Sequence, residues 1–247
     1  MHSPVEQFAI KVLFALNLFG FDIQFTNSAL FMVLAVLVSA AFLYFAMAPA
    51  ATVPGRMQGL AEMLYEFVSD MVRSNVGSEG RPYFPFVFTL FVFVLFSNLL
   101  GLIPYSYTTT SQIVVTFAMA MFIFIGVTLI ALFKHGLHFF SFFVPAGAPK
   151  VLIPFLVLIE VISYFVRPVS LSVRLFANML AGHTMLKVFG GLAVMIASAG
   201  GLFVAGSILP LVAIIGLTGL EILVAVLQAY VFTILTCMYL NDALHLH

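Results

Sequence analysis

Charged residues are scarce in this sequence, and their scarcity limits what the protein can be. Only 7% of the 247 residues are Asp, Glu, Lys or Arg, and 64% are hydrophobic. An ordinary soluble domain carries about 25% charged residues. The formal net charge is zero, so the basic surface of a nucleic-acid-binding protein is not expected. The apolar runs are long and unbroken rather than alternating, which predicts an integral membrane protein of the all-α class.

Several chemical motifs are also missing. Cys237 is the single cysteine, so no disulfide can form within the chain, and we interpret it as a buried, inert thiol. No Cys or His pairs have the spacing of metal ligands, and no glycine-rich phosphate-binding loop is present. We therefore expect no metal and no cofactor. The N-terminus lacks the basic segment and cleavage site of a signal peptide, so none is expected.

The apolar runs predict about five membrane-embedded helices and one amphipathic helix in a single membrane domain, residues 1–247. The parts are a first span at 28–48, an amphipathic surface helix at 56–75, a helical hairpin at 84–133 and a long, tilted hairpin at 151–247. Two helices are expected in the last part, at about 151–188 and 204–244. At about 1.5 Å per residue each exceeds 50 Å, so both must lie oblique in a core roughly 30 Å thick.

The segment 56–75 differs from the others because charged side chains recur on it every three or four residues. These are Glu62, Glu66, Asp70 and Arg73. Apolar residues fill the opposite face, which predicts a helix that lies on the membrane surface or packs on a neighbour. Its side of the membrane holds five basic residues (Arg56, Arg73, Arg81, Lys134 and Lys150), whereas the other holds Lys11. The positive-inside rule therefore predicts a cytoplasmic surface helix and an external N-terminus.

Arg174 stands out within the last apolar part. No charged residue lies within six positions on either side, and an arginine at membrane depth costs roughly 2.5 to 3.5 kcal/mol on insertion scales. Arginine stays protonated in proteins, so this residue is a fixed positive charge. We expect an anionic group to visit it.

Other polar residues share the face of Arg174 on the penultimate helix. Glu160, Arg167 and Asn178 point within about 40° of it, at about 100° per residue. His183 lies about 180° away from Arg174 and so faces a different neighbour. The four residues on one face therefore predict a polar stripe along one side of this helix.

Three of the intramembrane residues can gain and lose a proton. These are Glu160, His183 and Glu221, and Glu221 shares its helix face with Gln228. Arg174 cannot transfer a proton. The pattern predicts proton movement part-way from each side of the membrane, with a fixed charge that prevents a continuous path.

Structural alternatives remain for most of these residues. His183 could bond a neighbouring backbone carbonyl, and Arg167 could pair with Glu160 or sit near an interface. Gln228 could serve as a link between helices. The secondary candidates Asn98 and Gln112 could be capping or packing residues.

Two segments resemble subunit a of F-type ATP synthases. They are PVSLSVRLFANMLAGH (Pro168 to His183), with Glu221-x6-Gln228 following, and SNLLGLIPYSYTTTSQ (Ser97 to Gln112). The early EQF at Glu6 to Phe8 is similar as well. A His at 183 with a Glu at 221 resembles the mitochondrial and alphaproteobacterial branch, and the acid and imidazole stand exchanged in other bacterial members. This exchange implies that the two positions are spatial neighbours.

The resemblance implies a function as the proton-channel stator of the ATP synthase membrane sector, without ATP hydrolysis by this chain. Arg174 would face the rotating ring of c subunits. Asn178, His183, Glu221 and Gln228 would belong to the access path or its boundary with the ring. Glu160 would belong to the opposite access path.

The same resemblance implies partners and a location. The expected partners are the c-ring, b-type peripheral-stalk subunits, the remaining ATP synthase subunits and membrane lipid. The expected location is the bacterial inner membrane, with the mitochondrial inner membrane as the alternative.

Two other classes compete with this reading. A proton-coupled secondary transporter usually shows internal repeats, and none is detectable. A haem-holding membrane anchor needs axial histidines on facing spans, and only His183 lies deep in one. The sequence leaves open whether sodium or protons are moved, and which of His183 and Glu221 is the obligatory carrier.

Overall fold

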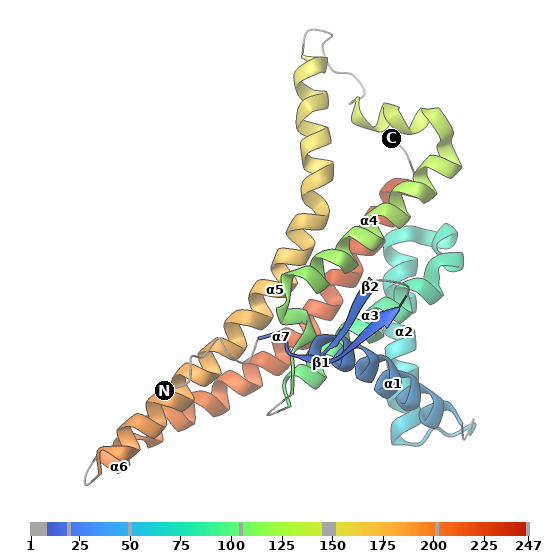
Figure 1. The fold of residues 1–247 in the computed structure, drawn as a ribbon. Coiled ribbons are helices and arrows are strands. Elements are labelled where there is room, and N and C mark those ends of the chain that lie inside the picture. The colour runs from blue at the N-terminus through green and yellow to red at the C-terminus, as the bar shows by residue number, and fades with distance from the viewer. Residues whose placement is uncertain are drawn as a thin grey trace. The chain divides into compact units, whose positions relative to one another are not determined.

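The computed structural model describes residues 9–18, 21–48, 51–103, 106–144, 152–200 and 203–245. Its helices are α1 (Asn27–Met47), α2 (Arg56–Val76), α3 (Phe84–Gly101), α4 (Ile113–His135), α5 (Ile153–Ser198), α6 (Phe203–Gly206) and α7 (Ile208–Leu244) (Figure 1). The short 3-10 helices are η2 (Gly77–Tyr83), η3 (Thr109–Ser111) and η4 (Gly136–Phe143). Five helical stretches in the described residues are long and apolar enough to cross a membrane. The all-α prediction is confirmed.

The last two long helices have 46 and 37 residues. Helix α5 runs ten residues beyond the expected end near 188, through Gly190 and Gly191, to Ser198. Apolar surroundings offer no water to the backbone, and continuing the helix satisfies each peptide group internally. Glycine therefore breaks a helix less readily here than in a soluble protein.

A β-hairpin precedes α1, and the sequence analysis did not predict it. Strands β1 (Val12–Leu18) and β2 (Phe21–Thr26) pair antiparallel, with Val12 opposite Thr26 and Leu18 opposite Phe21. The rings of Phe14 and Phe25 stack at 4.8 Å. Asn27 connects the hairpin to α1, because its Oδ1 accepts hydrogen bonds from the backbone N–H groups of Lys11 and Ser28.

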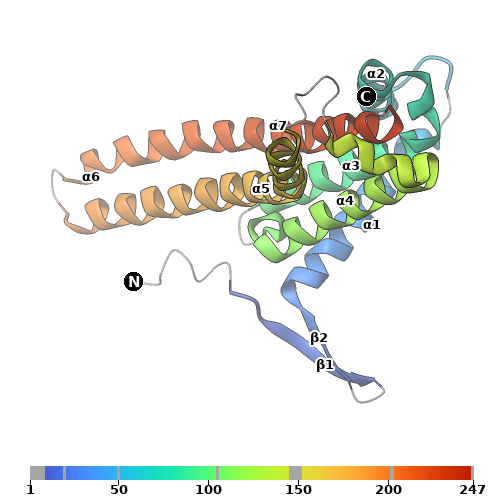
Figure 2. The same cartoon turned by 90° about the horizontal axis from the view of Figure 1, so that it is seen from above.

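The described residues form two compact units. Unit 1 contains the residues up to Tyr44, Val92–Gln112 and Leu175–Ala229, and unit 2 contains Phe45–Phe91, Ile113–Arg174 and the residues from Tyr230 onward. Helices α1, α3, α5 and α7 thus contribute to both units. In unit 1 the later part of α5 runs beside the earlier part of α7, as Figures 1 and 2 both show.

Asn98 links three segments in the interior of unit 1. It is 0% exposed. Its amide nitrogen donates to the carbonyl oxygen of Ala225 on α7 at 3.1 Å, and its amide oxygen accepts from the Thr110 hydroxyl at 2.8 Å. Helix α3, helix α7 and the segment after α3 are therefore held by one side chain.

In unit 2, side chains join α4 to α5 and α7. The hydroxyl groups of Thr128 and Tyr164 lie 2.6 Å apart and connect α4 with α5. The His135 ring contacts the carbonyl oxygen of Ala243 at 3.1 Å and connects α4 with α7. Lys134 forms an ion pair with Glu79 of η2.

Replacing Asn98 by alanine should destabilise the chain by about 1–3 kcal/mol, because the buried Thr110 hydroxyl would lose its acceptor. The measurement is the midpoint of thermal unfolding in detergent. Asn75→Ala is the matched control, since among the described residues the Asn75 amide bonds only to the Met71 carbonyl of its own helix. Equal midpoints for the two variants would contradict the linking role of Asn98.

Candidate functional site

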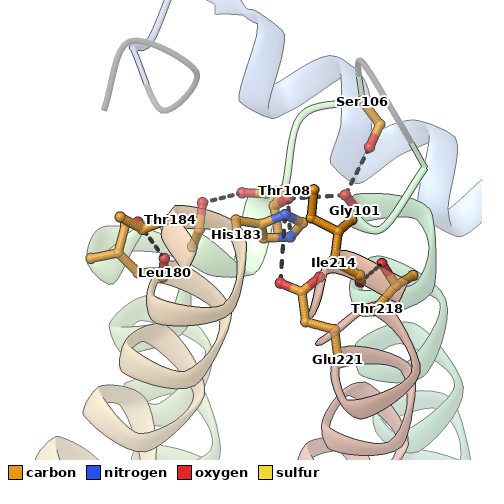
Figure 3. A network of polar contacts seen from close by, with 10 residues as sticks. Gly101, Ser106, Thr108, Leu180, His183, Thr184, Ile214, Thr218 and Glu221 are labelled. Atoms are coloured by element: carbon orange, nitrogen blue, oxygen red, sulfur yellow. Dashed lines mark hydrogen bonds and ion pairs between the residues drawn. The ribbon is translucent and has the colours of Figure 1, made fainter. Parts of the chain in front are cut away.

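A buried carboxyl group and a buried imidazole face each other in unit 1. His183 lies on α5 and Glu221 on α7, and Nδ1 of the ring is 3.9 Å from Oε1 of the carboxyl group (Figure 3). The side chains are 12% and 8% exposed. The resemblance implied that positions 183 and 221 are neighbours, and in the structure they are. Titratable side chains at such depth are typical of proton relays.

Thr108, in the segment between α3 and α4, contacts the other ring nitrogen of His183. Its hydroxyl oxygen lies 2.9 Å from Nε2 and donates to the Gly101 carbonyl at 3.2 Å (Figure 3). A hydroxyl has one proton to donate. When that proton goes to Gly101, Nε2 donates to Thr108, and in a neutral ring Nδ1 then turns its lone pair towards Glu221.

The carboxyl group of Glu221 has no hydrogen-bond partner among the described residues. Both oxygens are buried, and neither has a hydrogen bond to any residue that the structure describes. Leaving a buried polar group unpaired costs about 1–3 kcal/mol, so the arrangement needs an explanation. A group that exchanges its proton supplies one, since firm hydrogen bonds would favour a single protonation state.

Gly182 makes room for this carboxyl group. A Cβ atom at that position would lie against Oε1 of Glu221 and 2.9 Å from its Cγ. Even an alanine would therefore displace Glu221. The absence of a side chain at 182 allows α5 and α7 to bring the acid and the imidazole together.

The three amide candidates have different surroundings. Asn98 has the linking contacts described above, and Gln112 hydrogen-bonds the hydroxyl of Tyr107. Burial raises the pKa of Tyr107, and the Gln112 bond opposes this shift. Gln228 is buried on α7, seven residues after Glu221. The contacts of Asn98 and Gln112 are those of packing residues, which was one of the alternatives.

The predicted stripe on α5 is only partly covered. Arg174 and Asn178 are exposed, and Glu160 is half-buried. Within the described residues Arg174 has no hydrogen bond or ion pair. An arginine left without a partner at membrane depth is costly, so a visiting anion remains the prediction for this residue.

Arg167 has a different environment from Arg174. Its Nη1 lies 2.8 Å from Oδ2 of Asp242. Its guanidinium carbon is 5.3 to 5.7 Å from three ring centroids, those of Phe142, Tyr164 and Tyr239. Among the described residues the ion-pair partner of Arg167 is therefore Asp242, and no ion pair joins Arg167 to Glu160. Cation–π contacts add to the attraction.

Three residues of these sites were not predicted. Asp242 had a recognisable signal, since it is an acid near the end of the last apolar run. Gly182 directly precedes His183, but glycine is common in membrane helices. Thr108 belongs to a run of three threonines, and nothing in that run distinguishes the one whose hydroxyl reaches His183.

Known proteins resemble this chain over its whole length. The model of the "ATP synthase A chain" family matches residues 29–241. The ATP synthase subunit a of Rhodospirillum rubrum is 55% identical over 247 residues, which is 100% of both chains. The chain belongs to the ATP synthase A chain family. The subunit a of Rhizobium rhizogenes is 53% identical over 244 residues, covering 99% of this chain and 98% of the relative. The subunit a of Mesorhizobium japonicum is 56% identical over 243 residues, covering 98% of this chain and 96% of the relative.

Membership of the ATP synthase A chain family confirms the resemblance seen in the sequence. It assigns the chain to the membrane sector of an ATP synthase, where it works in a complex with other ATP synthase subunits. Membership of this family also supports a role of the chain in hydrogen ion transport. The relatives named above are bacterial, and the apolar helices agree with a membrane protein.

Arg167 and Asp242 should show coupled effects on stability. Arg167→Gln should lower the thermal midpoint, because a partly buried Asp242 would lose its partner. The double change Arg167→Gln/Asp242→Asn should recover part of the loss, with a coupling of about 0.5–3 kcal/mol in a double-mutant cycle. The comparison cycle uses Glu160→Gln in place of Asp242→Asn and should show no coupling. Coupling to Glu160 alone would mean that the ion pair is assigned wrongly.

Proposed function

We propose that this chain is the proton-translocating stator subunit of its ATP synthase, with two offset half-channels that open to a rotating c-ring. The single observation that carries the proposal is the buried pair of Glu221 and His183. The carboxyl group lacks hydrogen bonds within the described residues, and the imidazole faces it. A structural role would favour a satisfied carboxyl group, whereas a proton-exchanging role accounts for an unsatisfied one.

In this proposal one access path passes through Glu221 and His183. With Nε2 donating to Thr108, Nδ1 is free to take the proton of a protonated Glu221 and to return it. The pair then alternates between neutral acid with neutral ring and carboxylate with imidazolium. Both states keep the Thr108 contact, so the ring need not turn for each proton. Asn178 and Gln228 contribute polar groups at the boundary between this path and the ring.

Arg174 separates the two paths in the proposed mechanism. Its charge is permanent, and a cation near a carboxylate lowers the carboxylate's pKa. A c-subunit carboxyl group that arrives at Arg174 would release its proton there and regain one only after moving on. A proton gradient is thereby converted into rotation. The exposed position of Arg174 and the absence of an ion pair to it among the described residues support this role.

Glu160 serves the opposite path in the proposal. It lies fourteen residues before Arg174 on α5, about 21 Å at 1.5 Å per residue. It is half-buried, and its alternative partner Arg167 is occupied by Asp242. A carboxylate in this position could accept protons that leave the ring and draw them towards the cytoplasm.

The partners and location follow from the same proposal. The chain would contact the c-ring through the Arg174 face of α5 and would be held by b-type peripheral-stalk subunits. The proposed location is the bacterial inner membrane. The surface helix at 56–75, corresponding to α2, would lie on its cytoplasmic side.

Arg174→Ala should abolish ATP-driven proton pumping in inverted vesicles, because the ring carboxyl group would lose its fixed counter-charge. Arg174→Lys should not restore full pumping, since a desolvated lysine can lose its proton. Arg56→Ala, at the exposed start of α2, is the control and should pump normally. Pumping by Arg174→Ala at the rate of the control would refute the proposed role.

Thr108→Val should lower passive proton conduction roughly two- to tenfold, the effect of losing one hydrogen bond of about 0.5–1.5 kcal/mol. Valine keeps the shape of threonine but removes the oxygen that holds Nε2. The pH of half-maximal conduction should also shift, whereas Thr108→Ser should keep the original profile. Lys187, four residues after His183, is a charged group whose field reaches the ring, so Lys187→Gln should be measured alongside. An unchanged profile in Thr108→Val would show that Thr108 only packs.

A further inference from the structure

A hollow of about 460 Å³ lies on unit 2, where α2, η2 and the start of α3 meet. We call it the arginine hollow and define it by six of its lining residues: Tyr65, Ser69, Arg73, Ser78, Arg81 and Phe84. Two arginines and three residues with hydroxyl groups thus line one concave surface. It is separate from the acid–imidazole pair, which belongs to unit 1.

The turn that places Arg81 beside this surface depends on two glycines. Gly77 ends α2 with a φ of 77°, a left-handed conformation that side chains disfavour. At Gly80 a Cβ atom would lie 2.8 Å from Cβ of Val76 and 2.9 Å from Cγ1 of Val72. The turn therefore packs tightly against the last turns of α2, and the shape of the hollow is part of the fold.

The arginine hollow is positively charged, and none of its lining residues carries a negative charge. Among the described residues, neither Arg73 nor Arg81 has an ion pair, and no carboxylate lines the hollow. Glu79, the acid of η2, forms its ion pair with Lys134. Two guanidinium groups with neighbouring hydroxyls suit an anion that offers several oxygens, such as a phosphate.

The sequence of α3 indicates the depth of the hollow. Helix α3 begins at Phe84 and carries no charged residue through its 18 positions, a length of about 27 Å that nearly matches the hydrocarbon core. Phe84 therefore lies close to the edge of that core, and the hollow lies at the level of the lipid headgroups. The Tyr65 ring packs against those of Phe84 and Phe88 at 4.8 and 5.9 Å. Tyr65 and Phe84 give the hollow an aromatic wall, and tyrosine is enriched at membrane interfaces.

We propose that the arginine hollow binds the phosphate group of an anionic phospholipid. Arg73 and Arg81 contact the phosphate oxygens, the hydroxyl groups complete the hydrogen bonding, and the acyl chains follow the aromatic wall towards α3. Basic pockets at the membrane surface recognise anionic headgroups in this way. The lipid would hold α2 to the start of α3.

The test uses the whole ATP synthase complex in phosphatidylcholine vesicles that contain a small fraction of a photoactivatable phosphatidylglycerol. After illumination, labelled peptides of this chain are mapped. The expected label falls on the segment from residue 65 to residue 88. It should drop about fivefold in Arg73→Gln or Arg81→Gln and about 25-fold in the double variant, the effect of roughly 1 kcal/mol per basic residue.

Three control variants test whether loss of label comes from the charge of the hollow rather than from misfolding or from lost proton transport. Arg56→Gln removes an arginine of α2 outside the hollow and should label like the parent. Arg73→Lys/Arg81→Lys keeps the charge and should retain most of the label, which guards against a misfolded Gln variant. Arg174→Ala should also label normally, because lipid binding does not require proton transport.

Four outcomes would overturn the proposal. A photoactivatable phosphatidylcholine that labels the segment equally would show that anionic charge is not recognised. Full competition by inorganic phosphate would make the ligand a free phosphate rather than a lipid. Labelling that persists in the double Gln variant would show that the two arginines do not bind the lipid. Protection of the segment from every lipid probe in the complex would mean that a protein subunit covers it.

Discussion

The cost of holding polar groups away from water governs this chain. Lipid offers no hydrogen-bond partners, so the backbone forms its hydrogen bonds within helices. Each polar side chain inside the membrane likewise needs a hydrogen-bond partner or a functional role that offsets the cost of its burial. Asn98 meets this requirement with a donor and an acceptor contact that tie three segments. Glu221 does not meet it among the described residues, and that difference distinguishes the candidate functional site.

The two arginines of α5 differ in whether another residue of the chain compensates their charge. Arg167 is held by Asp242 and surrounded by three aromatic rings, so its charge is compensated within the chain. Arg174, seven residues later, is exposed and has no hydrogen bond or ion pair among the described residues. A compensated charge stabilises the fold, whereas an uncompensated one is available to a group from outside. The proposed mechanism assigns that group to the c-ring.

Most of the architecture was predictable because the membrane imposes it. Hydrocarbon thickness fixes how many apolar residues a span needs, so the apolar runs at 28–48 and 84–133 correspond closely to α1 and to α3 with α4. The hairpin of β1 and β2 was not predicted. A strand pair so near the start depends on pairing between two short segments, which the hydropathy of either segment does not reveal. The end of α5 was placed too early, because glycines that end soluble helices are tolerated in apolar surroundings.

The sequence by itself determined which residues are chemically unusual: an arginine, two glutamates and a histidine in apolar helices are conspicuous in any arrangement, because their desolvation is costly wherever they lie. The tertiary structure alone decided which of them meet. It placed His183 against Glu221 through the missing side chain of Gly182, joined Thr108 to the ring, and gave Arg167 to Asp242 rather than to Glu160. Helix periodicity orders residues around one helix. Contacts between helices depend on how side chains from distant segments pack, and one missing Cβ atom can decide them.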